Sequence, residues 1–540
     1  MSEYDFIIVG AGSAGCALAN RLSENGRYSV MLLEAGGSDR NFWIQVPIGY
    51  GKTFFRKSVN WMYMSEPVPA LDGRQSYWPR GKVLGGSSSI NAMVFVRGQP
   101  QDFDTWQDMG NPGWGWDGVL PYFRKLETND RGASDVRGGD GPVHIKTTDG
   151  ERHPLCEAFF QAGSELQYPY NADFNGERQD GVGGYQINVK DGLRMSAARA
   201  YLAPARKRAN LRIETLAHAT SILFEGRRAA GIVYRQKGAV RQARARREVI
   251  LAAGAINTPQ LLQLSGIGPA ALLKEKGIDI LHAAEGVGRH LQDHLCIDYL
   301  YRSKAPSLNE QLYPWYGKLW QGMKYLATRK GPLSLSLNQA GGFVRSRPGL
   351  EDPDIQLFFS PVSYTKAPAG KRPLMNPDPF PGFLLSAQPT KPTSRGHLAI
   401  RSADPFEAPV IHPNYLETEK DVQDLLAGAR ILRRFAETPA LSAIIDAELD
   451  PGPRIHSDED MIADIRARAA TVFHPVGTCR MGPDPEKDVV DARLSVRGCE
   501  GLRVADASIF PTLTSGNTNA PAIMVGEKAA DLILADHAGR

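Results

Sequence analysis

The chain has 540 residues and a formal net charge of +4 at pH 7. Its apolar fraction of 42% and charged fraction of 23% are typical of a folded globular protein, and its length exceeds what one hydrophobic core usually supports. So weak a charge gives no reason to expect a nucleic-acid partner, and we expect two intertwined domains that can bury a cofactor.

Three further features of the composition limit the interpretation. Five cysteines, an odd number without CxxC spacing, predict neither a disulfide framework nor a zinc site and favour a reducing compartment. No apolar run reaches the ~18 residues of a membrane-spanning helix, and the first residues enter a strand without a charged leader. We therefore expect a cytoplasmic protein, monomeric or homodimeric, and leave open a peripheral contact with the inner membrane. The basic stretch at 241–247 is interpreted as a solvated strand entering the core.

The first 34 residues predict a β-α-β unit that binds a dinucleotide. Residues 6–9 and 29–34 have the pattern of strands, and residues 13–24 that of a helix. In the connecting turn, the first glycine permits a tight bend, the second lets the backbone approach a pyrophosphate, and the third allows close helix packing. The acid that ends the second strand would accept hydrogen bonds from the adenosine ribose. The predicted contacts are Gly10, Gly12, Ser13, Ala14, Gly15, Glu34 and Ala35. This motif admits both NAD and FAD.

The rest of the chain predicts a dinucleotide domain built from separated pieces. The apolar stretches REVILAAGA and GLRVADASI have the character of buried parallel strands that rejoin the first sheet. PDIQLFFSPV, GFLLSAQPT and HLAIRSAD predict strands of a mixed or antiparallel sheet in a second domain. The Pro- and Gly-rich residues 366–381 are either a mobile loop over an active site or a plain surface loop. We assign residues 1–160, 193–297 and 468–540 to the first domain, and residues 161–192 and 298–467 to the second.

Several long motifs in the same order as in a known family supply the next inference. PRGKVLGGSSSINAMVFVRG at 79–98 and GAINTPQLLQLSGIGP at 254–269 resemble the two signatures of the glucose-methanol-choline oxidoreductases. The resemblance continues through VGRHLQDH, HPVGTCRMG and GNTNAPAIMVGEKAADLI and covers nearly the whole chain. It implies an α/β fold with a Rossmann-like FAD-binding domain and a discontinuous substrate-binding domain, and hydride transfer from an alcohol carbon to flavin N5.

The resemblance also implies which residues hold the cofactor. Family members with covalent FAD attach it through a histidine directly before the asparagine of the first signature. Ile90 stands there, before Asn91, so we expect non-covalent FAD. Asp506 would contact the ribityl or pyrophosphate region, with a helix cap as the alternative. The further FAD contacts expected are Trp61, Val83, Gly86, Ser87, Asn91, Ala92, Met93, Val94, Ala219, Ala507, Asn517, Thr518 and Asn519.

His474 and Asn517 are the expected catalytic residues. Alcohol oxidation requires removal of a hydroxyl proton, a role that suits a neutral imidazole, and TVFHPVGTCRMG resembles the surroundings of the family's base. Asn517 stands where the family has a second histidine or an asparagine; it would donate to the substrate oxygen or cap the following helix. His290 and His294 have the spacing of two metal ligands on one helical face, but no third ligand accompanies them, so we expect no metal.

The sequence favours a neutral primary alcohol as substrate. Choline-type members carry an acid in the segment written here LNQAGGFVRS, where we place Gln339. Val472 and Phe473 would add apolar surface beside the base. Electrons would pass to oxygen or a quinone, with a dehydrogenase favoured. The alternatives are a choline dehydrogenase-type activity, a non-redox lyase or decarboxylase on the same scaffold, and a flavin-binding protein without catalysis.

Overall fold

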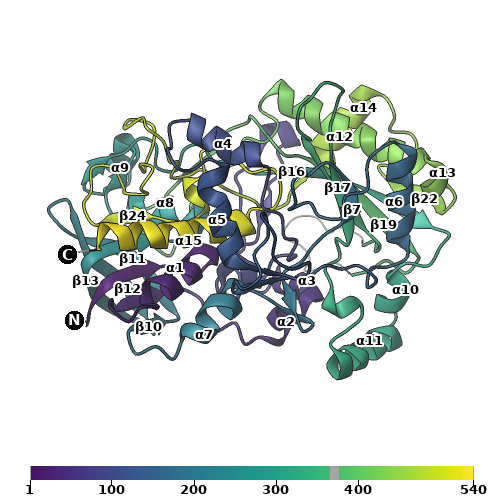
Figure 1. The fold of residues 1–540 in the computed structure, drawn as a ribbon. Helices are drawn as coiled ribbons and strands as arrows, with labels where there is room; N and C mark the ends of the chain where they lie inside the picture. The colour runs from purple at the N-terminus through teal and green to yellow at the C-terminus, as the bar shows by residue number, and fades with distance from the viewer. Residues whose placement is uncertain (1, 365–375, 539–540) are drawn as a thin grey trace.

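Two seven-stranded sheets lie toward opposite ends of the molecule, with loops and helices between them (Figure 1). The computed structural model describes residues 2–364 and 376–538. Most of the predicted loop at 366–381 therefore lies outside the described residues. The mixed α/β class predicted from the sequence is confirmed.

The first sheet is built on the predicted β-α-β unit. β1 (Ser2–Val9) pairs in parallel with β2 (Val30–Leu33) on one side and β13 (Ala239–Leu251) on the other, and α1 (Ser13–Ser23) connects β1 to β2. β24, from near the carboxyl end, pairs in parallel with β13, so both segments expected to rejoin this sheet do so. The remaining strands are β10 (Leu211–Glu214), β11 (Ala217–Glu225), β12 (Arg228–Gln236) and β24 (Leu502–Val504).

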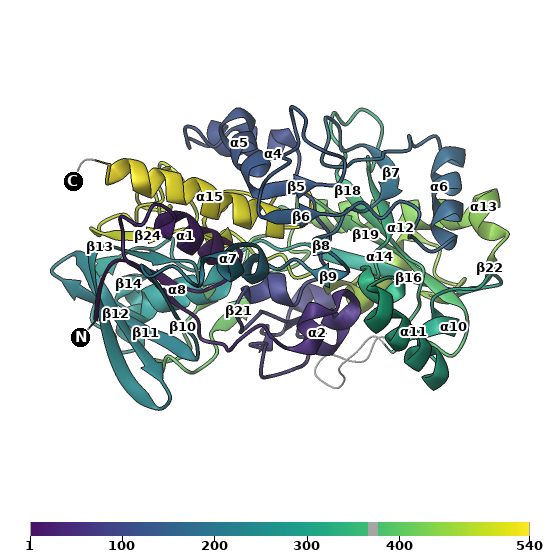
Figure 2. The ribbon, with the colours of Figure 1, turned by 60° about the horizontal axis from the view of Figure 1, so that its bottom comes forward.

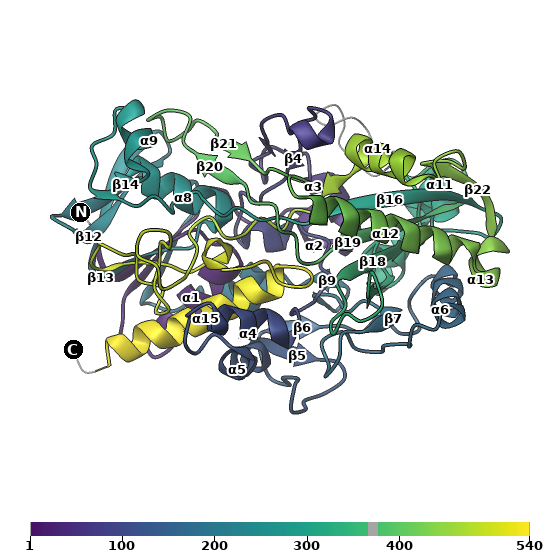
Figure 3. The same cartoon turned by 90° about the horizontal axis from the view of Figure 1, so that it is seen from above.

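The helices of this half bring distant parts of the chain together. α8 (Gly254–Leu264) follows β13 directly, and α15 (Asn519–Asp536) packs against α1. Seen from above, α15 runs along the first sheet while α12 (Glu419–Glu437) covers the second (Figure 3). The amino and carboxyl ends of the chain thus contribute to the same layer.

The second sheet is antiparallel at every pairing along its path. Its order is β22 (Ile445–Asp450), β16 (Leu295–Ser303), β19 (Gly382–Pro389), β18 (Ile355–Ser360), β17 (Ala340–Val344) and β7 (Gly181–Gly184), with β23 (Ala470–Thr471) paired to β16. PDIQLFFSPV and GFLLSAQPT form β18 and β19, as predicted.

Two elements differ from the assignment made from the sequence. HLAIRSAD forms β20 (His397–Ala399), which pairs with β21 (Val410–His412) beside α8, so its placement in the second sheet was wrong. α6 (Leu155–Glu165) packs against β7, although residues up to 160 were given to the first domain. Both errors concern segments that lie between the two sheets. The sequence pattern of such a segment predicts a strand or a helix but does not show which sheet it packs against. The remaining domain boundaries stay a prediction.

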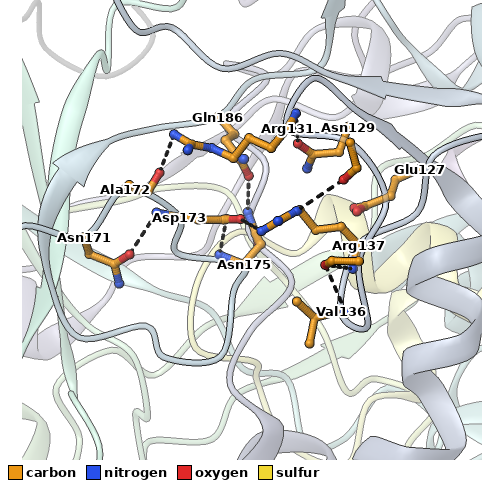
Figure 4. A network of polar contacts seen from close by, with 12 residues as sticks. Glu127, Asn129, Arg131, Val136, Arg137, Asn171, Ala172, Asp173, Asn175 and Gln186 are labelled. Atoms are coloured by element: carbon orange, nitrogen blue, oxygen red, sulfur yellow. Dashed lines mark hydrogen bonds and ion pairs between the residues drawn. The ribbon is translucent and has the colours of Figure 1, made fainter.

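A buried ion pair holds the last residues of the first signature in place. Arg97 is fully buried, and its Nη2 lies 2.6 Å from Oε1 of Glu127. The backbone N–H of Arg97 donates to Oδ1 of Asn175 at 2.9 Å, and Nδ2 of Asn175 donates to the carbonyl oxygen of Phe95 at 3.0 Å and to Oε1 of Gln186 at 2.8 Å. Figure 4 shows Glu127, Asn175 and Gln186 of this network from close by. Residues 95–97 are thereby held by Glu127, through the Arg97 side chain, and by Asn175, through the backbone.

We predict that Glu127→Gln lowers the free energy of unfolding by about 3–5 kcal/mol, because it leaves the Arg97 guanidinium buried without a countercharge. Denaturant titration followed by circular dichroism measures the loss. The matched control is Glu225→Gln, which breaks the exposed pair with Arg244 and should cost less than about 1 kcal/mol. Equal losses in the two variants would contradict the role given to the buried pair.

Candidate active site

A cavity of about 1080 Å³ runs from the glycine turn at the end of β1 to His474. This volume lies at or above the upper end of the ~300–1,000 Å³ common for small-ligand pockets, so it can hold a dinucleotide together with a small substrate. Its wall draws on the first sheet at one end and on β16, β18 and β19 of the second sheet at the other. The cavity therefore spans the seam between the two halves.

The glycine turn is shaped to receive a phosphate. A Cβ on Gly10 would lie 2.4 Å from the carbonyl oxygen of Ala252, and one on Gly15 would lie 1.9 Å from that of Gly10. Gly12 has only the Ala252 oxygen at 3.8 Å, so packing leaves its Cβ position open. The amino terminus of α1 carries neither a side-chain cap nor an acid in its first turn. Its free N–H groups and positive dipole end suit an anion.

Glu34 closes the adenosine end of the cavity. Its Oε2 accepts a hydrogen bond from the backbone N–H of Ala11 at 3.0 Å, and its Oε1 accepts one from Gly36 at 2.8 Å. Burial raises the pKa of this carboxyl group to about 7, partly offset by those two donors and by Lys82. Further donors, such as ribose hydroxyls, would stabilise the carboxylate. The side chain thus fits the ribose role predicted for it.

The predicted cofactor contacts gather along this cavity with two exceptions. Gly15 and Val83 are buried outside its lining, where Gly15 packs α1 against the turn and Val83 forms a bridge with Gly37. The contacts that line it are Gly10, Gly12, Ser13, Ala14, Glu34, Ala35, Trp61, Gly86, Ser87, Asn91, Ala92, Met93, Val94, Ala219, Asp506, Ala507, Asn517, Thr518 and Asn519. The residues present fit FAD.

Asp506 lines the cavity, but protein donors occupy its carboxylate. Oδ1 accepts from the backbone N–H of Ser508 at 2.8 Å and caps a short helix, η6 (Ala507–Ile509). Oδ2 accepts from Gly254 N–H at 2.8 Å and from the Thr258 hydroxyl at 2.6 Å. The geometry thus supports the helix-cap alternative, with Asp506 joining the start of α8 to the strand end that precedes η6.

One residue that the sequence did not single out positions the first signature. Arg194 is almost fully buried, and its Nη1 donates to the backbone oxygen of Asn91 at 2.7 Å and to Oδ1 of Asn91 at 2.8 Å. Burial lowers the pKa of Arg194 to about 9. No motif pointed to Arg194, because its partner lies 103 positions earlier in the chain.

Two histidines meet at the far end of the cavity. Nδ1 of His294 lies 3.0 Å from Nδ1 of His474, and Nε2 of His294 lies 3.0 Å from the carbonyl oxygen of Thr390. A carbonyl oxygen only accepts, so His294 carries its proton on Nε2 and accepts through Nδ1. His474 then carries its proton on Nδ1, and its Nε2 is unprotonated and presents a lone pair. The sequence interpretation of His294 as merely structural missed this contact; its place in HLQDH was the available signal.

Asn517 faces that lone pair. Its Nδ2 lies 3.2 Å from Nε2 of His474, and its Oδ1 accepts from Nε2 of Gln356 at 3.4 Å. Oε1 of Gln356 in turn accepts from Gln388 at 2.8 Å, so a chain of amides fixes the orientation of Asn517. α15 begins at Asn519 with Thr518 as its N-cap and no side-chain cap bond, so the capping alternative for Asn517 is wrong.

The backbone around His474 is strained and held in place. Phe473 has φ of 71°, a left-handed conformation that costs about 1–3 kcal/mol in a non-glycine residue. Nη2 of Arg80 donates to the Phe473 carbonyl oxygen at 2.6 Å, and Oδ1 of Asp293 accepts from the His474 N–H at 2.6 Å. Burial raises the pKa of Asp293 to about 6, although the hydroxyl groups of Thr471 and Tyr415 donate to it.

Electrostatics keep the base neutral. Burial first, and then the neighbouring His294 and Arg80, hold the pKa of His474 well below that of an ordinary histidine. Burial also lowers the pKa of His294 to about 4. Both imidazoles are therefore uncharged at neutral pH, as the tautomers above require.

Beyond the base, the cavity wall is mainly apolar. The rings of Phe54 and Phe473 meet edge to face at 5.6 Å between centroids. The other apolar residues that line this end are Tyr50, Phe55, Leu300, Leu337, Phe358, Tyr364, Leu384 and Val472. Two acids, Asp298 and Asp450, also line it. This surface suits the carbon skeleton of an alcohol.

Gln339 does not stand where the sequence placed it. Its side chain accepts a hydrogen bond from the backbone N–H of His153 at 2.7 Å and lies outside the cavity lining, whereas its neighbour Asn338 lines the cavity. Successive side chains of an extended segment point in opposite directions, so the assignment was one residue out of register. The placement of Gln339 in the cavity was therefore wrong, although the residue that lines the cavity in its stead, Asn338, is also an uncharged amide.

Among the described residues, no group of three or more His, Cys, Asp or Glu side chains could hold a metal ion.

Two models of one protein family match this chain. The chain matches the amino-terminal model of the GMC oxidoreductases over residues 4–296 and the carboxyl-terminal model over residues 392–526. It is 44% identical to alcohol dehydrogenase [acceptor] of Pseudomonas putida, over 98% of this chain and 96% of that protein. It is 43% identical to mitochondrial choline dehydrogenase of Mus musculus, over 98% and 89% of the two chains.

Solved structures resemble it over almost the whole length. Pyridoxine 4-oxidase from Mesorbium loti gives a TM-score of 0.88 at 32% identity, covering 98% of each chain. Formate oxidase gives a TM-score of 0.93 at 28% identity, covering 99% of each chain.

We predict that Gly12→Ala folds normally yet is purified with little FAD, because its Cβ would meet no protein atom closer than 3.8 Å but would project where the phosphates bind. The flavin absorbance per protein chain and the melting temperature of the apoprotein measure the two effects. Gly322→Ala, in open space on a helix, is the control and should keep its flavin. A Gly12→Ala protein with full flavin content would contradict the assignment.

Proposed function

The chain belongs to the GMC oxidoreductase family and is an FAD-dependent enzyme that oxidises alcohols, and we propose that His474 takes the hydroxyl proton of a neutral primary alcohol. The observation that carries the proposal is the unprotonated Nε2 of His474. It faces the cavity beside the Asn517 amide, and the proton on the opposite ring nitrogen is directed to His294. This ring nitrogen can therefore accept a proton from the substrate, as a general base does.

The proposed step uses two side chains of this protein. Bound FAD would supply the acceptor for the hydride of the alcohol carbon. His474 accepts the hydroxyl proton at Nε2, and Nδ2 of Asn517 donates a hydrogen bond to the same oxygen as it becomes negative. Because Gln356 already orients this amide, its dipole needs no reorganisation during the step. The product is the aldehyde.

The substrate is proposed to be a primary alcohol with an apolar body. The support is the aromatic and aliphatic wall around Phe54 and Phe473. Burying the carbon atoms of an alcohol against this wall would remove apolar surface from water and so favour binding. A second candidate is choline-type activity. Asp298 in the same wall favours it, because a carboxylate and aromatic faces together suit a quaternary ammonium group.

The electron acceptor and the location belong to the same proposal. We propose that a quinone-like acceptor, rather than oxygen, takes the electrons and that the enzyme is cytoplasmic with a peripheral contact at the inner membrane. The named relative from Pseudomonas putida, an alcohol dehydrogenase [acceptor], supports a dehydrogenase. Within the described part of the chain, no helix combines the length and the apolar character needed to cross a membrane. That the enzyme is a monomer or a homodimer stays a prediction.

Anaerobic stopped-flow spectroscopy of the purified flavoprotein tests the reaction. We expect alkanols and benzyl alcohol to bleach the flavin faster than choline, and His474→Ala to slow bleaching at least about 10²–10⁴-fold, the usual contribution of a general base. Val240→Ser, at an exposed site outside the cavity lining, is the control. Faster reduction by choline would select the second candidate. A flavin that stays oxidised during turnover would indicate the lyase alternative, and an unimpaired His474→Ala would reject the assigned base.

We predict that His294 acts as a positioning residue whose loss changes the pH profile. His474 must be neutral to act, so flavin reduction is fast above its pKa and is lost as the pH falls through it. The depressed pKa of His474 keeps the parent fast through neutral pH. His294→Ala removes the acceptor for the Nδ1 proton and one cause of the depressed pKa, so reduction should slow about 10–100-fold and its acid limb should move to higher pH.

The conservative variant separates this role from a structural one. In His294→Asn, Oδ1 replaces Nδ1 as the acceptor and should recover part of the rate. Both variants should retain FAD. If both show the parent's pH profile and rate, the tautomer relay does not operate.

A further inference from the structure

Seven of the fifteen large apolar side chains that are exposed in the described part of the chain lie on or beside one helix, α11 (Trp315–Thr328). Between 48% and 76% of the surface of each of these side chains is exposed. They are Tyr313, Trp315, Tyr316, Leu319, Trp320, Met323 and Leu326. Monomeric soluble proteins rarely gather so much apolar surface unless it binds something. The helix has no place in the mechanism proposed above.

The apolar side chains of α11 form one face that points away from the protein. With about 100° of rotation per residue, Trp315, Leu319, Met323 and Trp320 fall within an arc of about 140°. Gln321 and Tyr325, on the opposite side, are the buried residues of the helix. Tyr325 donates to the Gly192 carbonyl oxygen at 2.8 Å, and Gln321 donates to Oε1 of Gln311 at 3.0 Å. The inner face is therefore the polar one.

Positive charge borders this face and negative charge is missing from its segment. Lys318 and Lys324 flank the apolar arc, one on each side, and Arg329 and Lys330 follow the helix, all four exposed. Residues 311–350 contain no Asp or Glu. Aromatic rings with lysines at the border are the composition of helices that lie in a membrane interface. At an anionic lipid surface each such lysine or arginine contributes about 1 kcal/mol of attraction.

A second exposed aromatic pair lies on the same side. α2 (Phe42–Gln45) exposes Phe42 at 50% and Trp43 at 36%, with ring centroids 5.1 Å apart. It packs on η1 (Pro47–Gly49), η1 packs on η5 (Pro332–Ser334), and η5 packs on α11. Figures 1 and 2 both show α2 and α11 along this side of the molecule. Residues 40–65 again lack acids, and Arg40, Lys52, Arg56 and Lys57 are exposed.

We propose that α11 and α2 together form a docking surface for an anionic phospholipid bilayer, in which the apolar arc enters the headgroup region and the lysines contact lipid phosphates. This makes specific the membrane contact of the proposed function, while its chemistry is independent of the oxidation. The surface adjoins the substrate end of the cavity, because η5 leads directly to Leu337 and Asn338 in its wall and η1 leads directly to Tyr50.

Co-sedimentation of the full-length flavoprotein with vesicles tests the surface. We expect binding to vesicles of phosphatidylcholine with phosphatidylglycerol, weaker binding to phosphatidylcholine alone, and weakening by salt. Trp315→Ser/Trp320→Ser and Lys318→Glu/Lys324→Glu should each lower the partition coefficient on the order of tenfold or more. Val240→Ser/Ile280→Ser, which removes two exposed apolar side chains elsewhere, is the matched control and should bind as the parent does.

Two further measurements separate the causes of any failure. Flavin reduction by a soluble alcohol without vesicles should be unchanged in all these variants, so loss of vesicle binding and loss of chemistry are distinguishable. Analytical ultracentrifugation reports whether the parent self-associates. A parent that ignores anionic vesicles, or helix variants that bind them as well as the parent does, would overturn the proposal. So would a dimer that becomes monomeric in Trp315→Ser/Trp320→Ser while vesicles stay unbound.

Discussion

The hydrogen bond between Nε2 of His294 and the carbonyl oxygen of Thr390 determines the state of the whole reactive end. Because that oxygen can only accept, it fixes the tautomer of His294, and His294 fixes the tautomer of His474. The relay contains no charged group. It gives the base a defined direction and keeps it unprotonated at neutral pH, but it does not make the base stronger, as a carboxylate partner would. Such a base suits a step in which a preorganised amide, Asn517, shares the developing negative charge.

The parts of this relay come from the second sheet, although His474 belongs to the segment that returns to the first. Thr390 follows β19, Gln356 lies on β18, and His294 directly precedes β16. The glycine turn and Glu34, by contrast, lie at strand ends of the first sheet. Cofactor binding and base orientation are thus properties of different sheets. The strained backbone at Phe473, held by Arg80 and Asp293, lies where the two meet, which is where stored strain commonly serves function.

Sequence alone predicted what is encoded in continuous motifs. The turn at Gly10, the strand before it and the acid at Glu34 follow from local periodicity and backbone geometry, and His474 and Asn517 follow from motif order. Arg194 and Gln356 could not be predicted, because their roles depend on partners more than one hundred positions away in the chain. The error at Gln339 has another cause. A motif locates a segment but does not show which of its alternate side chains point to which face. A shift of one residue therefore places a side chain in the core instead of in the cavity wall.

α11 departs from the pattern of the other long helices. α12 has the same amphipathic spacing and turns its apolar side to the second sheet, burying Leu425, Leu432 and Phe435. α11 turns its apolar side outward and buries an amide and a tyrosine instead. Local sequence and burial disagree here, and in natural proteins such disagreement is concentrated at functional sites. Since the same stretch of chain continues into the apolar wall at Leu337, one segment forms both an outward apolar surface and an inward one.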